Sequence, residues 1–200
     1  MVKLILIRHG QTEWNTTGKF QGWTDVFLSE TGKQQIKKLA ENFPVDHIDL
    51  LYSSDLKRAV DTAKTFSDYF GCKIQLEPAF REVCFGDWEG LTYREINEEW
   101  SHECSMFYTS PDCLKIPNGE TFSEVQERAF GKIENIVSMH NDKTIVVISH
   151  GAVIRTVIAK ILHMPLNFLW SIRQDNASFN TIIYADGHFV LQDMNNTSHL

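Results

Sequence analysis

Two apolar segments that lie far apart in the chain are each followed by closely similar polar residues. Lys3–Ile7 is a β-branched, apolar run that changes abruptly to Arg8-His9-Gly10. Thr144–Ser149 has the strongest strand character in the chain, and His150-Gly151 follow it directly. Uninterrupted runs of this kind are typical of strands buried on both faces of a parallel sheet. Because open α/β sheets hold their ligand sites at the carboxyl ends of the strands, both histidines are expected at one edge.

Strands and helices alternate along the rest of the chain. The other strands are predicted over His47–Tyr52, Lys73–Leu76, Asn180–Tyr184 and His188–Gln192, the last two joined by the turn Asp186-Gly187. Helices are predicted from the Ser29 cap to Phe43, then over Leu56–Phe70, Thr92–Trp100, Phe122–Val137 and Ala152–Leu162. This order predicts an α/β fold, a three-layer sandwich whose mainly parallel central sheet carries helices on both faces.

The remaining segments show no periodicity. Gln11–Val26 and His102–Gly119 are predicted to be loops, and the last residues of the chain are expected to fray. Without repeats or a linker, residues 1–200 are expected to form a single domain.

Composition narrows the class of partner. The net charge is −7, from 19 Lys and Arg against 26 Asp and Glu, which argues against a nucleic-acid or anionic-membrane surface. No signal peptide or membrane span is visible, and the four cysteines are widely spaced, as expected of reduced thiols in a cytoplasmic protein. A zinc site would need closer ligand spacing.

A third strand end adds a second arginine. His47–Tyr52 leads to Ser53-Ser54-Asp55, and Arg58 falls in the first turn of the next helix. Each residue alone has an ordinary explanation, Arg58 as a solvated helix residue and His150 as a core histidine. Together, two arginines and two histidines at one sheet edge favour a pocket for a phosphate, because guanidinium forks match its oxygens.

The sequence resembles the histidine phosphatase superfamily, and within it the phosphoglycerate-mutase-like branch. The motifs that carry this resemblance are R-H-G-Q-T-E-W-N (Arg8–Asn15), Q-G-W-T-D (Gln21–Asp25), S-S-D-L-K-R-A-V-D-T-A (Ser53–Ala63), R-E-V-C-F-G-D-W-E-G (Arg81–Gly90), N-G-E-T-F (Asn118–Phe122) and S-H-G-A-V-I-R (Ser149–Arg155). They occur in the family's order over nearly the whole chain.

The resemblance implies the fold of that branch and a role for each matching residue. His9 would be the nucleophile that forms a phosphohistidine, and Glu82 would be the proton donor. The catalytic set implied is His9, Glu82, Arg8, Arg58 and His150, and the substrate-binding set is Arg8, Asn15, Gln21, Gly22, Arg58, His150 and Gly151. The resemblance implies no metal and no cofactor, a small phosphomonoester as partner, and leaves a homodimer open.

The choice between mutase and phosphatase depends on an insertion over about 83–119, expected to form a lid. Its acidic residues outnumber its basic ones, which suits an anionic leaving group poorly, whereas its aromatic residues suit an apolar one. The segments F-G-D-W-E-G-L-T-Y and N-G-E-T-F most resemble broad-specificity and α-ribazole phosphatases. We therefore expect a phosphomonoesterase, with α-ribazole 5′-phosphate as the first substrate to test.

Three alternatives remain open at this point. A phosphoglycerate mutase would return the phosphoryl group to a second position of its substrate. A non-catalytic regulatory module would bind phosphate without turning it over. A metallohydrolase would use His9, His150 and Glu82 as ligands.

Overall fold

The computed structural model describes residues 1–200 and contains one six-stranded sheet in the order β3-β2-β4-β1-β5-β6. The strands are β1 (Val2–Arg8), β2 (Leu50–Ser53), β3 (Ile74–Leu76), β4 (Thr144–Ser149), β5 (Phe179–Ala185) and β6 (His188–Asn196). β1 to β4 are mutually parallel, whereas β5 is antiparallel to β1 and β6 is antiparallel to β5. The predicted, mainly parallel α/β sheet is thereby confirmed.

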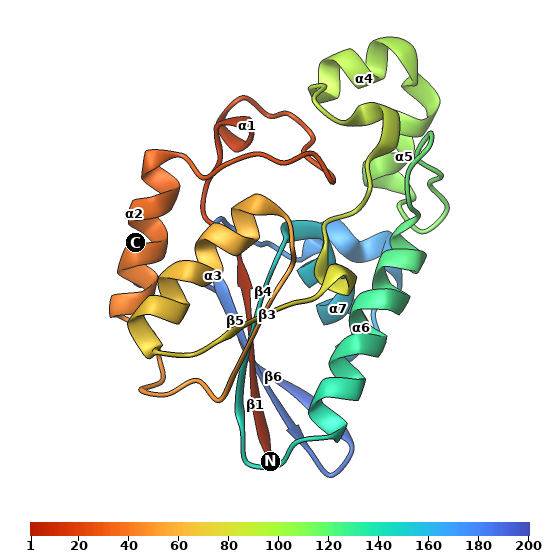
Figure 1. Ribbon diagram of the computed structural model, residues 1–200. Coiled ribbons are helices and arrows are strands. Elements are labelled where there is room, and N and C mark those ends of the chain that lie inside the picture. The colour runs from red at the N-terminus through yellow and green to blue at the C-terminus, as the bar shows by residue number, and fades with distance from the viewer.

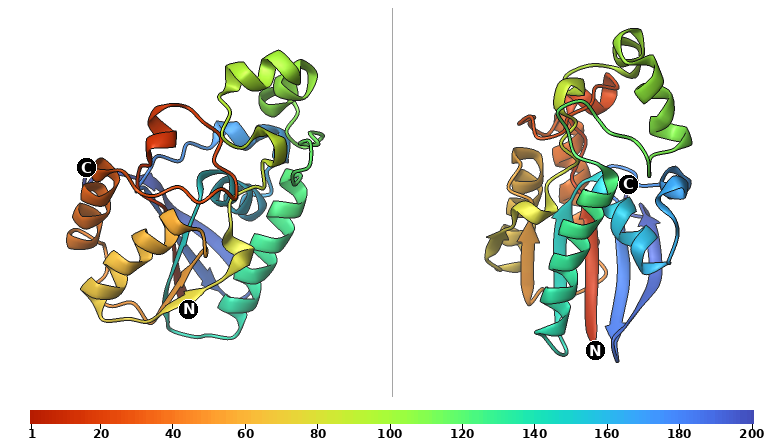
Figure 2. Two further views of the ribbon diagram at one scale, coloured as in Figure 1. Left: turned by 45° about the horizontal axis from the view of Figure 1, so that its top comes forward. Right: turned by 90° about the vertical axis from the view of Figure 1, so that its right-hand side faces the viewer.

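Helices cover both faces of this sheet (Figures 1 and 2). α2 (Glu30–Glu41) and α3 (Lys57–Phe70) pack on one face, and α6 (Phe122–Ser138) and α7 (Gly151–Ile161) pack on the other. Successive residues of a strand point to opposite faces. Accordingly, Leu4 and Leu6 enter the core under α6 and α7, while Ile5 and Ile7 enter the core under α2 and α3. These two cores make the predicted three-layer sandwich.

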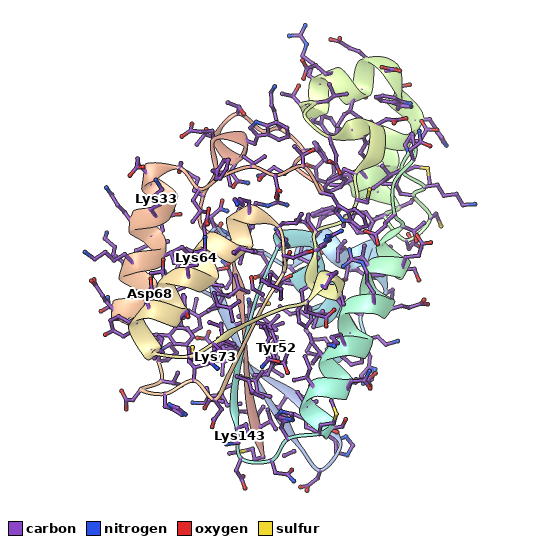
Figure 3. All side chains as sticks on the ribbon, viewed as in Figure 1. Lys33, Tyr52, Lys64, Asp68, Lys73 and Lys143 are labelled. Carbon is purple, nitrogen blue, oxygen red and sulfur yellow. The ribbon has the colours of Figure 1, made fainter.

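Local sequence signals set the helix ends. The Ser29 hydroxyl accepts a hydrogen bond from the Gly32 amide at 3.1 Å and so caps α2. Gly71, at φ 67°, ends α3 in the left-handed conformation that glycine adopts most readily. Figure 3 shows the charged, exposed side chains of Lys33, Lys64 and Asp68 on α2 and α3. The buried faces of the same helices are mostly apolar, as their periodicity predicts, with Arg58 and Thr62 as the buried polar residues of α3.

The predicted loop over His102–Gly119 is wrong in its first part. α4 (Tyr93–Glu99) is followed at once by α5 (Ser101–Thr109), and the irregular segment begins only after Thr109. α5 turns just two buried side chains inward, Cys104 and Phe107, so its periodicity is too short to recognise in the sequence. Tertiary packing supplies the rest of its stability, because Phe107 contacts a cluster of other aromatic rings.

Two smaller differences concern the ends of the chain. The short helix α1 (Glu13–Thr16) lies within the predicted loop Gln11–Val26. β6 continues to Asn196, so strand structure extends beyond the predicted end at Gln192. No helix has the combination of length and apolar character that crossing a membrane requires.

The arrangement leaves one end of the sheet available for a site. β1 rises from the N-terminus, and its carboxyl end lies below the loop that holds α1 (Figure 1). α4 and α5 project from the body of the protein at the same end (Figure 1). The 3₁₀ turns Pro78–Phe80, Gly86–Trp88 and Leu166–Ser171 complete the elements.

Candidate active site

The two predicted histidines lie side by side because their strands are neighbours. Arg8 at the end of β1 is paired in register with Ser149 at the end of β4, so His9 and His150 occupy equivalent positions just beyond. Their ring centroids are 5.2 Å apart, and the ring planes are inclined by 58°. Both rings are buried, with 2% and 0% of their residues' surface exposed. Sequence-distant imidazoles therefore share one small site at the sheet edge.

The hydrogen bonds of His9 define which nitrogen can react. Its Nδ1 lies 2.7 Å from the carbonyl oxygen of Gly10. A carbonyl can only accept, so Nδ1 carries the proton and Nε2 keeps its lone pair. Burial, with the charges of Arg58 and Arg8 adding to it, holds the pKa of His9 well below its ordinary value. The ring is thus neutral at pH 7, with Nε2 available as a nucleophile.

His150 is in the same tautomer as His9, with its ring proton on Nδ1, although its hydrogen bond is made by Nε2. Its Nε2 lies 2.8 Å from the hydroxyl oxygen of Ser54, which accepts a hydrogen bond from the Leu56 amide. We assign the Ser54 proton to the bond with Nε2, because the hydroxyl already accepts from Leu56, and this assignment leaves the ring proton on Nδ1. That Nδ1 is buried without a partner in the protein. Burial also lowers the pKa of His150 well below its ordinary value, so its ring is neutral at pH 7.

Arg8 and Arg58 are fixed by backbone carbonyls on one side of their guanidinium groups. Arg8 Nη1 donates to the Gln174 carbonyl at 2.7 Å. Arg58 donates to the carbonyls of Thr24 and Gly22 at 3.0 and 2.7 Å. The Nε atom of each arginine is buried and has no partner in the protein. Burial lowers the pKa of Arg58 to about 10, so it remains charged at neutral pH.

Glu82 lies next to the first turn of α7. Its Oε1 accepts from the Val83 amide at 3.1 Å, and its Oε2 lies 3.5 Å from the Ala152 amide. Glu82 lines the same cavity as His9. No group of three or more His, Cys, Asp or Glu side chains is placed to hold a metal ion.

A cavity of about 230 Å³ joins most of the predicted site residues. The residues of the predicted set that line it are Arg8, His9, Asn15, Gln21, Arg58 and Glu82. Three of the set, His150, Gly22 and Gly151, lie outside this lining. The cations Arg8, Arg58 and Lys19 line the cavity against one carboxylate, Glu82, so the cavity is positive although the protein is negative overall. A small anion suits it.

The loop residues Asn15 and Gln21 contribute amide groups. Asn15 Oδ1 accepts from the Thr12 amide at 3.0 Å and from Asn176 Nδ2 at 3.1 Å. Its own NH₂ group therefore remains available as a donor to the cavity. The buried Gln21 Oε1 has no partner in the protein.

The two glycines act through the backbone. Gly22 has φ 52°, and a Cβ atom added there would lie 1.9 Å from Glu89 Oε1. Its carbonyl orients Arg58, as described above. A Cβ atom on Gly151 would lie 3.0 Å from Arg155 Nη1 and 3.2 Å from Arg8 Nε, so glycine leaves room for both guanidinium groups.

The acidic residues of the 83–119 segment do not line the cavity. This finding corrects the expectation that the lid suits an anionic leaving group poorly. The Glu89 carboxylate binds the N-terminal loop, where it accepts hydrogen bonds from the amides of Trp23 and Thr24 at 2.8 and 2.9 Å. None of the remaining acidic residues lines the cavity, and five of them are exposed: Asp87, Glu95, Glu98, Glu99 and Asp112. The direction of these side chains is a tertiary property that composition does not contain.

The segment instead presents aromatic rings to the cavity. Phe85, Phe107 and Tyr108 line it, whereas Trp88, Tyr93 and Trp100 do not. Trp170, from the 3₁₀ turn Leu166–Ser171, completes the wall and donates its indole N–H to the Phe107 carbonyl.

Several residues at the site escaped the sequence reasoning. Lys19, Phe20 and Trp170 line the cavity, and no spacing in the sequence marks them. Arg155 lies beside Arg8 and 5.3 Å from the Trp170 ring, with its pKa lowered to about 10 by burial. It stands four residues after Gly151 on α7, so helical spacing could have placed it on the same face.

Comparison with known proteins agrees with this geometry. Residues 4–197 match the family model of the histidine phosphatase superfamily (branch 1). Phosphoserine phosphatase 1 of Hydrogenobacter thermophilus is 34% identical over 200 residues, which cover 100% of this chain and 95% of that protein.

Solved structures extend the similarity to three dimensions. Bacillus stearothermophilus YhfR superposes with a TM-score of 0.95 at 32% identity, covering 100% of this chain and 99% of that one. A phosphoserine phosphatase mutant from Entamoeba histolytica in complex with phosphoserine gives a TM-score of 0.91 at 34% identity, covering 100% of both chains. The Entamoeba enzyme is also known in complex with 3-phosphoglyceric acid. The chain therefore belongs to the histidine phosphatase superfamily, branch 1, and is a phosphatase of small phosphomonoesters.

Proposed function

We propose that this phosphatase is independent of metal ions and works through a phosphohistidine formed on His9. The observation that carries the proposal is the pairing of a neutral, buried His9, whose Nε2 is unprotonated, with donors that lack partners in the protein. Those donors are Arg8 Nε, Arg58 Nε and His150 Nδ1. A tetrahedral phosphoryl group presents the oxygens that would satisfy them.

The reaction runs in two displacements. His9 Nε2 attacks phosphorus, the N–P bond forms, and the P–O bond to the leaving group breaks. Arg8, Arg58 and His150 hold the equatorial oxygens, where charge is concentrated in the transition state. Glu82 gives its proton to the departing oxygen and then takes a proton from the attacking water. Water forms the new P–O bond as the N–P bond breaks, which releases inorganic phosphate and restores His9.

Residues 83–119 act as a lid over this reaction. The segment begins directly after Glu82 and supplies Phe85, Phe107 and Tyr108 to the cavity wall. The hydrogen bond from Trp170 to the Phe107 carbonyl joins α5 to the 3₁₀ turn Leu166–Ser171. Apolar walls exclude bulk water, which strengthens the electrostatic interactions inside.

O-phosphoserine is the first substrate candidate. The supporting observations are the excess of cations around the cavity and the similarity of the chain to phosphoserine phosphatases. A carboxylate next to the phosphate adds a second anionic group, which a cavity holding Lys19 besides the two arginines tolerates. α-Ribazole 5′-phosphate is the second candidate, favoured by the rings of Phe85, Phe107, Tyr108 and Trp170, on which a planar base can stack.

A turnover screen tests both candidates. It covers O-phosphoserine, α-ribazole 5′-phosphate, phosphoglycerates, nucleotides and sugar phosphates, each with and without exhaustive chelation. We expect release of inorganic phosphate that chelation leaves unchanged, with O-phosphoserine turned over best. Transfer between phosphoglycerate positions without release of phosphate would identify a mutase instead. Loss of activity on chelation would identify a metallohydrolase.

Quenching during turnover of a ³²P-labelled substrate tests the intermediate. An acid-labile, base-stable phosphoenzyme is expected in the native protein. Failure to find any labelled protein or any turnover would favour a regulatory module that only binds phosphate.

A further inference from the structure

The segment that presents Glu82 is irregular backbone, yet the carbonyl groups leading up to and including that of Glu82 are bound. Between the 3₁₀ turns Pro78–Phe80 and Gly86–Trp88 the chain has no strand or helix to hold it. The four consecutive carbonyls from Ala79 to Glu82 nevertheless all accept hydrogen bonds from side chains. Three of these four carbonyls accept from one residue of α6, Arg128.

From this arrangement we infer that Arg128, held by Glu120, is a positioning residue that sets the place of the Glu82 carboxyl group. The inference rests on the proton-donor role proposed above for Glu82. It assigns a task to the motif N-G-E-T-F (118–122), which supplies no residue to the cavity lining.

All five N–H groups of the Arg128 guanidinium donate hydrogen bonds. Nη1 donates to the carbonyls of Ala79 and Arg81, both at 2.8 Å, and Nη2 donates to the Glu82 carbonyl at 3.0 Å. Nε and Nη2 donate to the two carboxylate oxygens of Glu120 at 2.8 and 2.9 Å. Both side chains are about one-fifth exposed, so the pair is only partly screened by water.

Glu120 also binds the segment on the other side of Glu82. Its Oε2 accepts from the Cys84 amide at 2.9 Å. The ion pair therefore holds the backbone both before and after the proton donor.

Two further hydrogen bonds to these carbonyls hold the same segment in place. The Phe80 carbonyl accepts from the Ser149 hydroxyl at 2.9 Å, directly before His150. The Glu82 carbonyl also accepts from the indole N–H of Trp23 at 2.8 Å. Because a small misplacement of an acid costs much of its catalytic effect, these bonds bear on rate as well as on folding.

Only arginine can make this set of contacts. A lysine ammonium has three donors on one atom, whereas the planar fork of Arg128 reaches three carbonyls and a carboxylate at once. Arg128→Lys therefore keeps the charge opposite Glu120 and loses part of the hold on the carbonyls.

The experiment compares leaving groups in four variants: Arg128→Met, Arg128→Lys, Glu82→Gln and Lys132→Met. The measured quantity is the ratio of kcat/KM for a phosphate ester with a poor leaving group, O-phosphoserine or an alkyl phosphate, to kcat/KM for p-nitrophenyl phosphate. Lys132 is the matched control, since it lies one turn after Arg128 on α6 and pairs with Glu77 at 2.6 Å without touching the carbonyls of residues 79–82.

We expect Glu82→Gln to lower this ratio by about 100-fold, as loss of a general acid does. Arg128→Met and Arg128→Lys should lower it by about tenfold, and Lys132→Met should leave it unchanged. Thermal unfolding is followed in parallel, and Arg128→Lys serves if Arg128→Met does not fold. An unchanged ratio in the folded Arg128 variants, with a lowered ratio in Glu82→Gln, would overturn the inference alone. An unchanged ratio in Glu82→Gln would overturn the proposed proton donor and this inference with it.

Discussion

His9 and His150 stand 141 residues apart in the sequence, yet their ring centroids are 5.2 Å apart. The pairing of Arg8 with Ser149 across neighbouring parallel strands produces this contact. Both rings are neutral in a fully buried site, and they present different nitrogens, His9 an unprotonated Nε2 and His150 a protonated Nδ1. In the mechanism that we propose, His9 attacks the phosphoryl group and His150 donates a hydrogen bond to it.

His9→Ala is expected to abolish turnover while leaving the fold intact. Removal of a nucleophile that forms the covalent intermediate should lower kcat by about 10³-fold or more. Phosphate release and ³²P labelling measure the effect, and circular dichroism checks the fold. His188→Ala, at an exposed position of β6, is the control and should keep full activity. A His9→Ala protein that still turns over substrate would refute the assignment of the nucleophile.

The buried histidines are expected to make the protein less stable as pH falls below about 6.5. Their pKa values are lowered in the folded state, so below the ordinary histidine pKa the unfolded chain takes up protons that the folded chain refuses. Each histidine then lowers the free energy of unfolding by about 1.4 kcal/mol per pH unit, and above pH 7 it has no effect.

Urea unfolding from pH 5 to 8 in phosphate-free buffer measures this dependence. His9→Asn should show a shallower slope below pH 6.5 than the native protein. Identical slopes in the two proteins would contradict the lowered pKa of His9.

Gly22→Ala is expected to cost more stability and activity than Gly18→Ala. Both glycines have positive φ, 52° and 68°, so both substitutions carry backbone strain of about 1 kcal/mol. At Gly22 the new methyl group also collides with Glu89, which holds Trp23 and Thr24, and it disturbs the carbonyl that orients Arg58. At Gly18 nothing lies within 4 Å. Thermal unfolding and kcat/KM of the two variants, if equal, would show that backbone strain alone matters.

Arg58→Ala is expected to lower kcat/KM by about 100-fold or more. The substitution removes the positive charge that would face the phosphoryl group, and it leaves the carbonyls of Gly22 and Thr24 without their donor. Arg58→Lys restores the charge without the fork and should recover only part of the loss. Steady-state kinetics with p-nitrophenyl phosphate measures both, and full activity in Arg58→Lys would mean that charge alone suffices.

Trp170→Phe is expected to raise KM with little change in kcat. It keeps an aromatic wall but removes the indole N–H that binds the Phe107 carbonyl, so α5 is less firmly held over the cavity. Kinetics with O-phosphoserine separates the two constants. A fall in kcat at constant KM would place Trp170 in the chemical step instead of in substrate binding.

The strands and most helices could be predicted from the sequence because each is specified locally. β4 is an unbroken apolar run, and α2 and α3 carry their caps and apolar faces within their own residues. α5 could not be predicted, because Cys104 and Phe107 alone face inward and the rings around Phe107 come from distant segments. The antiparallel position of β5 beside β1 likewise has no local signal.

The sequence by itself determined that Arg8, His9, Arg58 and His150 reach one edge of the sheet, since parallel strands bring their carboxyl ends together. Only the tertiary structure decided what surrounds those groups. Most of the lid carboxylates turn to solvent, Glu89 binds the amides of Trp23 and Thr24, and Arg128 binds three backbone carbonyls beside Glu82. The physical reason is that side-chain direction and the binding of backbone carbonyls depend on contacts between distant segments, and these leave no periodic trace in the order of residues.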